Sequence, residues 1–448
     1  MYFIYSALSL ILFVLVSPYF LYQAIRYKKY IGNLRERLGY LPISFNVDGE
    51  ASIWIHAVSV GEALTARALA ADLKSRYPRL KLYLSTTTMA GQQVARSSLR
   101  HLVDGVFYFP FDWTFIVRRT LNLVKPRLFI MMETEIWPNL LHECRQRGIR
   151  TVMINGRIST RSYPRYRLVR PLFRRVLADV DRFCMQSEES AHRLIGLGAD
   201  PARVSVTGSL KFDSLEMPAP TAHGKPRERV LRFFRLSSHR TVIVAGSTMR
   251  GEEAAVLRAF GKVKATQTHA VAILAPRQPE RFAEVERLAR DAGFVTVRRS
   301  ELPIDAEPRA DVIVLDSIGE LAQLYQLATA VFVGGSLVDH GGHNILEPAI
   351  FGKPIVFGPH MQNFREIAET FVANGAAIQV ASDRDLDDVV LGLVRDPVHR
   401  ASLGAAARAL VEANRGAKEK TLAVISDLLP PAGAGGAGSN IRPFRLVQ

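Results

Sequence analysis

Asn344 and Glu347 lie three residues apart in the stretch GGHNILEPA, shortly after an apolar run typical of a buried strand. A carboxylate at this place can accept hydrogen bonds from sugar hydroxyls, and the free N–H groups at a helix start attract a phosphate. Gly341 and Gly342 would let a ligand approach the backbone closely. A capping interaction between Asn344 and Glu347 is the structural alternative. Together these features favour a binding site for a nucleotide sugar.

Other strand-like runs in the second half also end in residues that could hold an anion. The run VIVAGST contains Ser247 at its end, where small side chains leave backbone N–H groups accessible. Arg277 follows the run VAILAP and could bind a phosphate through two hydrogen bonds. Gly319 and Glu320 follow a third run, VIVLDS. Helix capping, or an arginine that is simply exposed, would explain each position taken alone.

In the first half, Glu62 follows the strand-like run SIWIHAVS. A glutamate in the first turn of a helix commonly complements the helix dipole and has no further role. At the carboxyl end of a parallel strand, however, we expect it to face a cleft between domains, where a partly buried carboxylate can act as a general base. In the stretch METEIWPN, Glu133 and Glu135 follow another strand. Two carboxylates at this place are unusual for a simple turn.

Arginines without an acidic neighbour fill the segment NGRISTRSYPRYRLVRPLFRR, residues 155–175. Runs of like charge commonly form a solvated surface. Here tyrosines and leucines are interspersed with the arginines, which favours a site for anionic lipid headgroups or substrate phosphates. The four arginines that we single out are Arg157, Arg161, Arg165 and Arg167.

Apolar runs that resemble strands alternate with helical patterns along most of the chain. This alternation is typical of parallel sheets with helices on both faces. A segment rich in Pro, Gly and Ser interrupts it near residues 212–225 and suits a linker. We therefore predict an α/β protein with two Rossmann-like domains. The predicted parts are an N-terminal anchor (1–25), a first domain (26–215), a second domain (216–428) and a low-complexity tail (429–448).

Residues 1–24 carry no charged side chain, and about 20 apolar residues suffice to span a bilayer. Tyrosines and phenylalanines lie at both ends of the segment, as at membrane interfaces, and basic residues follow it. The sequence thus predicts a single-pass transmembrane helix, with the rest of the chain on the cytoplasmic side. A cleaved signal peptide is the alternative, although a basic n-region and a small-residue cleavage pattern are missing.

The chain has 58 basic and 42 acidic side chains, which gives a net charge of +16. Such a charge suits nucleic acid, an anionic membrane or a phosphorylated substrate. Two cysteines argue against a disulfide framework. His340 and His343, with no spaced carboxylate or cysteine beside them, are a weak signal for a metal site.

Seven segments together resemble the 3-deoxy-D-manno-octulosonic acid (Kdo) transferases of lipopolysaccharide assembly. In chain order they are SVGE, METEIWPN, NGRIS, GSLKFD, APRQPERF, DSIGELAQLY and GGHNILEPA. The resemblance implies a GT-B glycosyltransferase fold, with an N-terminal acceptor domain and a C-terminal donor domain. It also implies CMP-Kdo as the donor and the lipid A precursor, lipid IVA, as the acceptor, at the cell inner membrane.

The resemblance further implies roles for single residues. Glu62 corresponds to the family's proposed catalytic base, which would take the proton of the attacking acceptor hydroxyl in an inverting transfer. The implied donor-binding residues are Ser247, Arg277, Gly319, Glu320, Asn344 and Glu347. The expected acceptor-binding residues are Glu133, Arg157, Arg161, Arg165 and Arg167. We expect anionic inner-membrane lipids as further partners, and neither a metal, another cofactor nor nucleic acid.

Three other functions fit parts of this pattern. A GT-B transferase that uses a UDP-sugar would share the architecture, and binding of UDP instead of CMP would identify it. A nucleotide-sugar epimerase of the same fold has little need for a membrane anchor or an arginine-rich segment. A non-catalytic lipid-binding protein would show no turnover.

Overall fold

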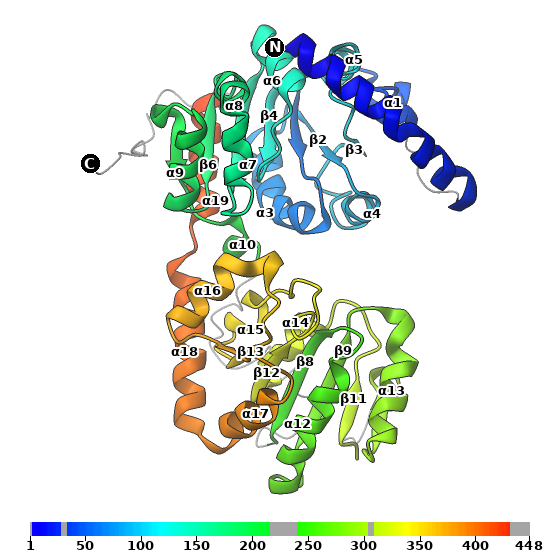
Figure 1. Cartoon of the computed structure of the whole chain (residues 1–448), viewed down its shortest axis with the longest axis vertical. Helices are drawn as coiled ribbons and strands as arrows, with labels where there is room; N and C mark the ends of the chain where they lie inside the picture. Colours follow the sequence, from blue (N-terminus) through cyan, green and yellow to red (C-terminus); the bar gives the residue numbers. More distant parts are fainter. Residues whose placement is uncertain (1, 28–33, 216–239, 303–308, 431–448) are drawn as a thin grey trace. The chain divides into compact units, whose positions relative to one another are not determined.

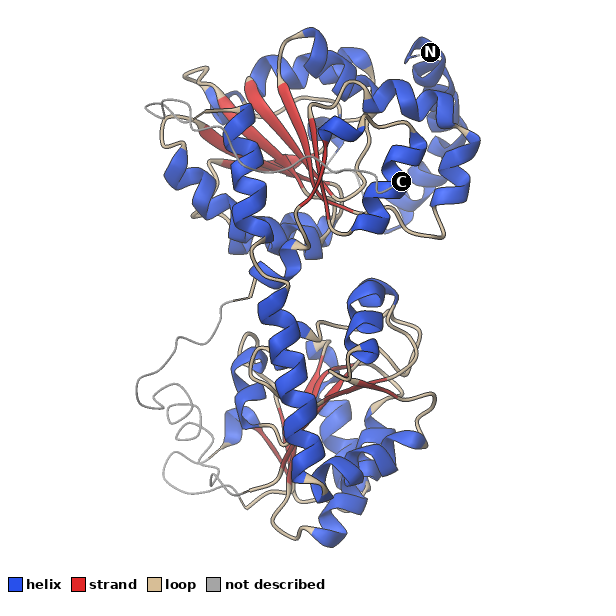
Figure 2. Ribbon diagram, turned by 90° about the vertical axis from the view of Figure 1, so that its left-hand side faces the viewer, coloured by secondary structure: helices blue, strands red, loops and turns tan. Residues whose placement is uncertain are grey.

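The computed structural model describes residues 2–27, 34–215, 240–302 and 309–430. Within these residues the chain forms two compact units, each built around its own parallel β-sheet (Figure 1; Figure 2). The expected linker falls mostly on residues 216–239, and most of the expected tail on residues 431–448. Both stretches lie outside the described residues.

The first unit contains Met1–Ser214 and Arg415–Gln448, and the second contains Leu215–Asn414. The first crossing between the units thus comes next to the predicted boundary of 215/216. The second crossing was not predicted. Our assignment of residues 415–428 to the second domain is wrong, because these residues belong to the first unit.

Helix α19 (Ala417–Leu428) explains this difference. Its apolar side chains, among them Leu422 and Ile425, are buried in the hydrophobic core of the first unit. The carboxylate of Asp213 accepts hydrogen bonds from the backbone N–H groups of Gly416 and Lys418 at the start of the helix. The last helix among the described residues therefore returns to the unit that contains β1 (Ser52–His56).

Seven strands form the sheet of the first unit, in the order β3-β2-β1-β4-β5-β6-β7, and all neighbours are parallel. The direction of winding reverses at β1, so the carboxyl ends of β1 and β4 lie side by side at the point where Rossmann-like sheets bind ligands. The strands are β1 (Ser52–His56), β2 (Lys81–Thr86), β3 (Gly105–Tyr108), β4 (Pro126–Met132), β5 (Arg150–Gly156), β6 (Arg182–Met185) and β7 (Val204–Val206).

Helices cover both faces of this sheet because successive residues of a strand point to opposite sides. Trp54 packs toward α5, α6, α8 and α9, whereas Ile53 and Ile55 pack toward α3, α4 and α19. The helices of this unit are α1 (Tyr2–Tyr27), α2 (Leu34–Arg37), α3 (Val60–Arg76), α4 (Met89–Ser98), α5 (Thr114–Val124), α6 (Pro138–Gln146), α7 (Tyr163–Leu168), α8 (Arg170–Leu177), α9 (Glu188–Leu197), α10 (Leu210–Asp213) and α19.

The second unit repeats this arrangement, with the parallel order β10-β11-β9-β8-β12-β13-β14. Its strands are β8 (Val242–Thr248), β9 (Val271–Pro276), β10 (Thr296–Arg298), β11 (Val312–Val314), β12 (Ala330–Val333), β13 (Ile355–Phe357) and β14 (Ile378–Gln379). Its helices are α12 (Glu253–Thr266), α13 (Phe282–Asp291), α14 (Leu321–Leu324), α15 (Leu346–Ala349), α16 (Arg365–Ala373), α17 (Asp385–Arg395) and α18 (Pro397–Ala413). The predicted α/β class with two Rossmann-like domains is confirmed.

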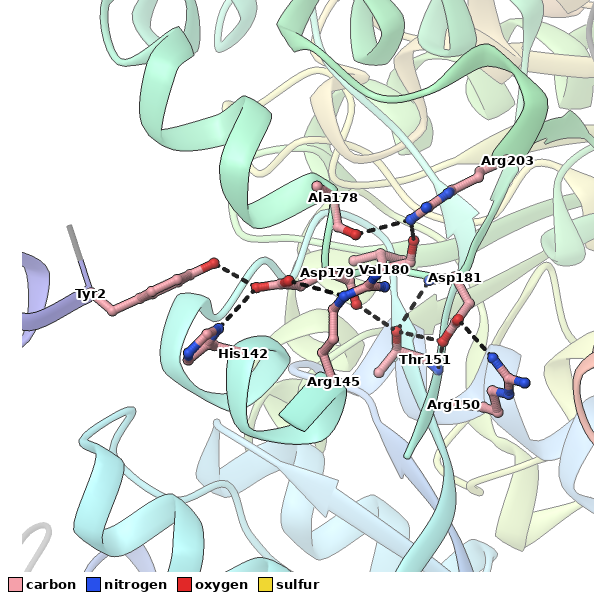
Figure 3. A network of polar contacts seen from close by, with 10 residues as sticks. All are labelled: Tyr2, His142, Arg145, Arg150, Thr151, Ala178, Asp179, Val180, Asp181 and Arg203. Atoms are coloured by element: carbon pink, nitrogen blue, oxygen red, sulfur yellow. Dashed lines mark hydrogen bonds and ion pairs between the residues drawn. The ribbon is translucent and has the colours of Figure 1, made fainter. Parts of the chain in front are cut away.

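Helix α1 lies against the first unit, and its first residue is held by a polar network (Figure 1; Figure 3). The hydroxyl of Tyr2 donates to Asp179, and the Tyr2 ring stacks on His142 of α6 at a centroid distance of 4.2 Å. Arg145, also on α6, lies near the second carboxylate oxygen of Asp179. The start of α1 is thus fixed to α6 and to the segment before β6.

Two serines extend this contact along α1. Asn139 donates to the Ser6 hydroxyl at 2.9 Å, and the Trp113 indole N–H donates to the Ser9 hydroxyl at 3.1 Å. Phe13 then meets the edge of the Trp113 ring. These residues recur every three or four positions, so one side of the helix faces the unit.

The opposite side of α1 is exposed and apolar. In the described part of the chain, no helix is sufficiently long and apolar to cross a membrane, so the predicted transmembrane helix is not supported. The sequence identified an apolar helix, but composition alone did not reveal the polar contacts along one side. The exposed apolar side chains are Phe3, Ile4, Leu8, Leu10, Ile11, Leu12, Val14 and Leu15.

Candidate active site

Glu62 lies in the first turn of α3, directly beyond the carboxyl end of β1. Its side chain turns back toward the preceding loop and is largely buried. One carboxylate oxygen accepts the backbone N–H of Val58 at 2.8 Å, and the other accepts the Ser59 hydroxyl at 3.0 Å. The carboxylate is therefore held in one orientation at the edge where ligand sites of parallel sheets form.

Two further carboxylates influence Glu62. Burial, followed by the charge of Glu133, raises the pKa of Glu62 to about 7, and Glu135 adds to the effect. The hydrogen bonds from Val58 and Ser59 act in the opposite direction. Burial, together with the charge of Glu133, also raises the pKa of Glu135 to about 7. A carboxylate with such a pKa can take up and release a proton near neutral pH.

Glu133 follows β4 directly, in a backbone conformation with φ of +54°. Asn155, near the end of β5, has φ of +53°, and Ser247, near the end of β8, has φ of +55°. Left-handed conformations of non-glycine residues cost about 1 kcal/mol or more and cluster at functional sites. Of the four described non-glycine residues with positive φ, only Lys125 lies away from a carboxyl end of a strand, and the other three lie at the carboxyl ends of β4, β5 and β8.

Asn155 was not singled out from the sequence. Its side-chain oxygen accepts the backbone N–H of Leu210 at 3.0 Å, which joins β5 to α10. Its backbone oxygen accepts from Gln186 at 2.8 Å. The NGRIS motif contains this residue, but only the left-handed backbone marks it as special, and a sequence does not display backbone angles.

The arginine-rich segment, residues 155–175, runs from the end of β5 through α7 into α8. Arg157 is half-buried, and its backbone oxygen accepts a hydrogen bond from Thr134 in the METEIWPN loop. Arg161, Arg165 and Arg167 are exposed. The structure therefore joins Arg157 to the loop that carries Glu133 and Glu135, and leaves the other three guanidinium groups at the surface.

In the second unit, Asn344 and Glu347 interact directly. The Asn344 amide donates to a carboxylate oxygen of Glu347 at 3.1 Å, and its oxygen accepts the Leu346 N–H at 3.1 Å. The structure thus contains the capping interaction between Asn344 and Glu347 that was the structural alternative. The helix that follows, α15, has only four residues. A single turn provides little helix dipole, so our expectation that a helix start attracts a phosphate here is not supported.

Arg277 supplies positive charge to the same place. Arg277 is exposed. Its backbone N–H donates to the backbone oxygen of Thr248 at 3.0 Å, so the loop after β9 is bonded to the end of β8. Burial raises the pKa of Glu347, while Asn344 and Arg277 oppose this. Burial, followed by Arg277, lowers the pKa of His343 to about 4, so the imidazole is neutral. Arg277, His343, Asn344 and Glu347 are thus brought together.

The remaining donor candidates lie at two other strand ends. Ser247 is half-buried beside Gly334, whose missing side chain leaves room for the Ser247 backbone. Gly319 is exposed, with φ of +91° and open space around it. Glu320 accepts the Ser317 hydroxyl at 2.5 Å and lies 3.2 Å from Arg299. Glu320 thus has both a hydrogen bond and an ion pair, whereas Glu347 has one hydrogen bond, from Asn344, so Glu320 is less available to a ligand.

Gly341 and Gly342 have a different role from the predicted one. A Cβ atom on Gly341 would lie 2.6 Å from the Asn363 amide, and one on Gly342 would lie 2.3 Å from the Met361 sulfur. Both residues have positive φ angles, +85° and +73°. The bare backbone therefore lets the loop pack against residues 360–363, and the expected close approach of a ligand is not what requires it.

The comparisons agree with this geometry. Residues 298–410 match the family model of glycosyl transferases group 1. A UDP-GlcNAc 2-epimerase from Neisseria meningitidis, solved with UDP-GlcNAc, has a similar fold, with a TM-score of 0.57 and 14% identity over 84% of this chain and all of that one. The chain thus has the two-domain fold of GT-B glycosyltransferases.

A family model on the first unit, together with relatives that span both units, identifies the family. Residues 32–214 match the family model described as 3-deoxy-D-manno-octulosonic-acid transferase (kdotransferase). A 3-deoxy-D-manno-octulosonic acid transferase from Haemophilus influenzae is 34% identical over 441 residues, which cover 96% of this chain and 98% of the relative. The same-named protein from Bordetella pertussis is 33% identical, covering 85% and 88%.

The chain therefore belongs to the 3-deoxy-D-manno-octulosonic acid transferase family. It is a glycosyltransferase that transfers Kdo in lipopolysaccharide biosynthesis, and the predicted family and enzyme class are confirmed. The roles given to single residues stay predictions.

Proposed function

We propose that the protein transfers Kdo from CMP-Kdo to lipid IVA at the cell inner membrane, with Glu62 as the general base. The observation that carries this proposal is the raised pKa of Glu62, about 7, in a carboxylate held at the end of β1. A base is most effective when its pKa lies close to the working pH. Glu62 would accept the proton of an acceptor hydroxyl as that oxygen attacks the anomeric carbon of Kdo.

The donor is proposed to bind through the second unit. The Arg277 guanidinium would hold the phosphate of CMP and stabilise its charge as CMP leaves. The Asn344–Glu347 pair would bind hydroxyl groups of the sugar, since Glu347 keeps free acceptor sites beside its contact with Asn344. Ser247, Gly319 and Glu320 are proposed to contact the rest of the nucleotide. Direct attack on the donor carbon would invert the anomeric centre, and we expect full activity in the presence of a metal chelator.

The acceptor is proposed to bind through the first unit. Lipid IVA carries phosphates, and Arg157, Arg161, Arg165 and Arg167 offer guanidinium groups after β5 and on or beside α7. The backbone of Arg157 bonds to the loop that carries Glu133 and Glu135. The acyl chains of this acceptor lie in a membrane. The exposed apolar side of α1 supports attachment by a helix that lies in the membrane surface without crossing it.

The direct test uses the purified full chain with CMP-Kdo and lipid IVA, and mass spectrometry of the lipid product. We expect addition of Kdo, and a loss of turnover of about 10²–10⁴-fold in Glu62→Gln, the usual contribution of a general base. Glu143→Gln is the matched control, because Glu143 is an equally buried carboxylate of the first unit that pairs with Arg118 and Arg147. It should keep its turnover.

Two results would contradict the proposal. Transfer from a UDP-sugar without use of CMP-Kdo would favour the alternative transferase. Unchanged turnover in Glu62→Gln would show that Glu62 is not the base. It would not contradict the proposed donor and acceptor.

A further inference from the structure

A buried carboxylate outside the predicted site residues organises the loop after β12. Glu252 precedes α12 and is fully buried. One of its oxygens accepts the backbone N–H groups of Met249 at 2.8 Å and Gly335 at 2.7 Å. The other accepts those of Ser336 and Leu337, each at 2.9 Å. Four backbone donors thus converge on a single side chain.

Three of these donors are consecutive residues of the loop. Successive N–H groups that point to one place form a nest of the kind that binds phosphate in other proteins. Here the nest is filled by the protein's own carboxylate, so Gly335, Ser336 and Leu337 do not offer these N–H groups to a ligand. The glycine-rich stretch therefore serves as a fixed support and not as a phosphate cradle.

The fourth donor ties this loop to the neighbouring strand. Met249 follows Ser247 and Thr248 at the end of β8, and β8 pairs with β12. The same oxygen of Glu252 accepts from Met249 and from Gly335, so the ends of both strands are fixed to each other. Gly334 lacks the side chain that would collide with the Ser247 oxygen at 2.4 Å, which permits this close approach.

The loop in turn supports the predicted donor residues. The oxygen of Gly335 accepts the N–H of Gly342 at 2.7 Å, and a Cβ on Gly335 would lie 2.9 Å from the His343 ring. Asn344 and Glu347 follow in the next four residues. The hydrogen bonds thus run from Glu252 through Gly335 to the segment that carries the Asn344–Glu347 pair.

We propose that Glu252 is a positioning residue for the donor site: its carboxylate fixes the backbone that holds Ser247 on one side and residues 342–347 on the other. The inference rests on the proposed binding of CMP-Kdo by these residues. Glu252 touches no substrate in this proposal. It acts through the loop. Removing its carboxylate therefore weakens donor binding more than it affects proton transfer by Glu62.

Glu252→Gln tests this with little change in volume. The amide nitrogen cannot accept a hydrogen bond, so one pair of N–H groups loses its acceptor. We expect CMP to bind about tenfold more weakly by calorimetry, because the loop that supports residues 342–347 is no longer fixed in one arrangement. The KM for CMP-Kdo should rise by a similar factor while kcat changes less than about twofold.

Hydrogen exchange of the backbone gives a readout that needs no ligand. The amides of residues 335–337 should exchange faster in Glu252→Gln than in the native protein. Asp387→Asn is the matched control, because Asp387 is also buried in the second unit but pairs with the side chains of Arg258 and Lys262. It should lower the melting temperature without changing CMP binding or the exchange of residues 335–337.

The outcomes separate this inference from the proposed function. A folded Glu252→Gln protein with native CMP affinity and native KM would overturn the positioning role, and so would an equal loss of affinity in Asp387→Asn. A native protein that binds no CMP would instead refute the proposed donor. If Glu252→Gln does not fold, Glu252→Asp keeps both oxygens, and we expect an intermediate CMP affinity; native affinity in this variant, with native exchange at 335–337, would overturn the role.

Discussion

The imidazole Nε2 of His56 lies 3.8 Å from a carboxylate oxygen of Glu135. The other ring nitrogen lies 3.2 Å from the Ser85 backbone oxygen, which suits a proton on Nδ1. Burial lowers the pKa of His56 to about 3, so the ring is neutral and brings no positive charge to Glu135. The acidic residues beside Glu62 are therefore not neutralised by this contact, and their charge contributes to the raised pKa of Glu62.

We predict that this pKa is visible in the pH dependence of transfer. A general base works only when deprotonated, so kcat/KM should fall as the pH decreases through about 7, the pKa of Glu62. Removing a neighbouring negative charge makes ionisation of Glu62 easier. Glu133→Gln should therefore move the acidic limb to lower pH, and Glu135→Gln should move it less, because Glu133 has the larger effect on Glu62. Rate measurements between pH 5 and 9 would show this.

The same Glu143→Gln protein serves as the control, since Glu143 is buried in the same unit and pairs with arginines. Its acidic limb should coincide with that of the native enzyme. If the acidic limb of the pH profile does not move in Glu133→Gln, another group limits activity at low pH. The same conclusion follows if Glu62→Gln keeps the acidic limb and native rates.

The strand-end rule explains why Glu62, Ser247 and Arg277 could be selected from the sequence. Alternating apolar runs reveal parallel strands, and the carboxyl ends of such strands share one edge. Glu252 could not be selected in this way. Its importance depends on Met249 and on a loop more than 80 residues further along the chain, and only the folded backbone brings these groups together.

Three predictions that the structure does not support have a related cause. The glycines at 341 and 342 showed that bare backbone was needed, but not whether a ligand or another loop comes close to it. Likewise, the apolar composition of α1 predicted burial in lipid, whereas Ser6 and Ser9 bond to the first unit. Helix α19 belongs to the first unit because of packing across the fold, which local patterns do not encode.

We predict that Gly342 contributes more to stability than a glycine that needs only its backbone angle. Gly342→Ala should lower the free energy of unfolding by about 2 to 4 kcal/mol, from left-handed strain plus the collision with Met361. Gly375→Ala is the control: φ is +62° there and nothing lies within 4 Å, so about 1 kcal/mol is expected. Urea unfolding measures both. Equal losses would mean that the packing against Met361 is unimportant.

The exposed arginines should affect the acceptor and spare the donor. Replacing Arg161, Arg165 and Arg167 together by glutamine removes three charges from the surface and should leave the fold intact. Because hydrogen bonds to charged phosphates are strong, we expect the KM for lipid IVA to rise at least about tenfold. CMP affinity should be unchanged. A double glutamine variant of Arg384 and Arg395, on or beside α17 of the second unit, removes two positive charges far from this segment in sequence and serves as the control. A larger effect on CMP than on lipid would place the segment near the donor.

The last prediction concerns the exposed side of α1. Leu8, Leu12 and Leu15 point away from the contacts made by Ser6 and Ser9 and are 61–72% exposed. Replacing all three by glutamine removes apolar surface without touching the hydrogen bonds that hold α1. Each buried leucine contributes about 1.5 to 3 kcal/mol, so binding to anionic vesicles should weaken at least about a hundredfold in a sedimentation assay.

Val398→Gln changes an equally exposed apolar residue of α18 and should bind like the native protein. Equal loss in both would point to a general effect, and native binding by the triple variant would show that α1 does not attach the protein to lipid.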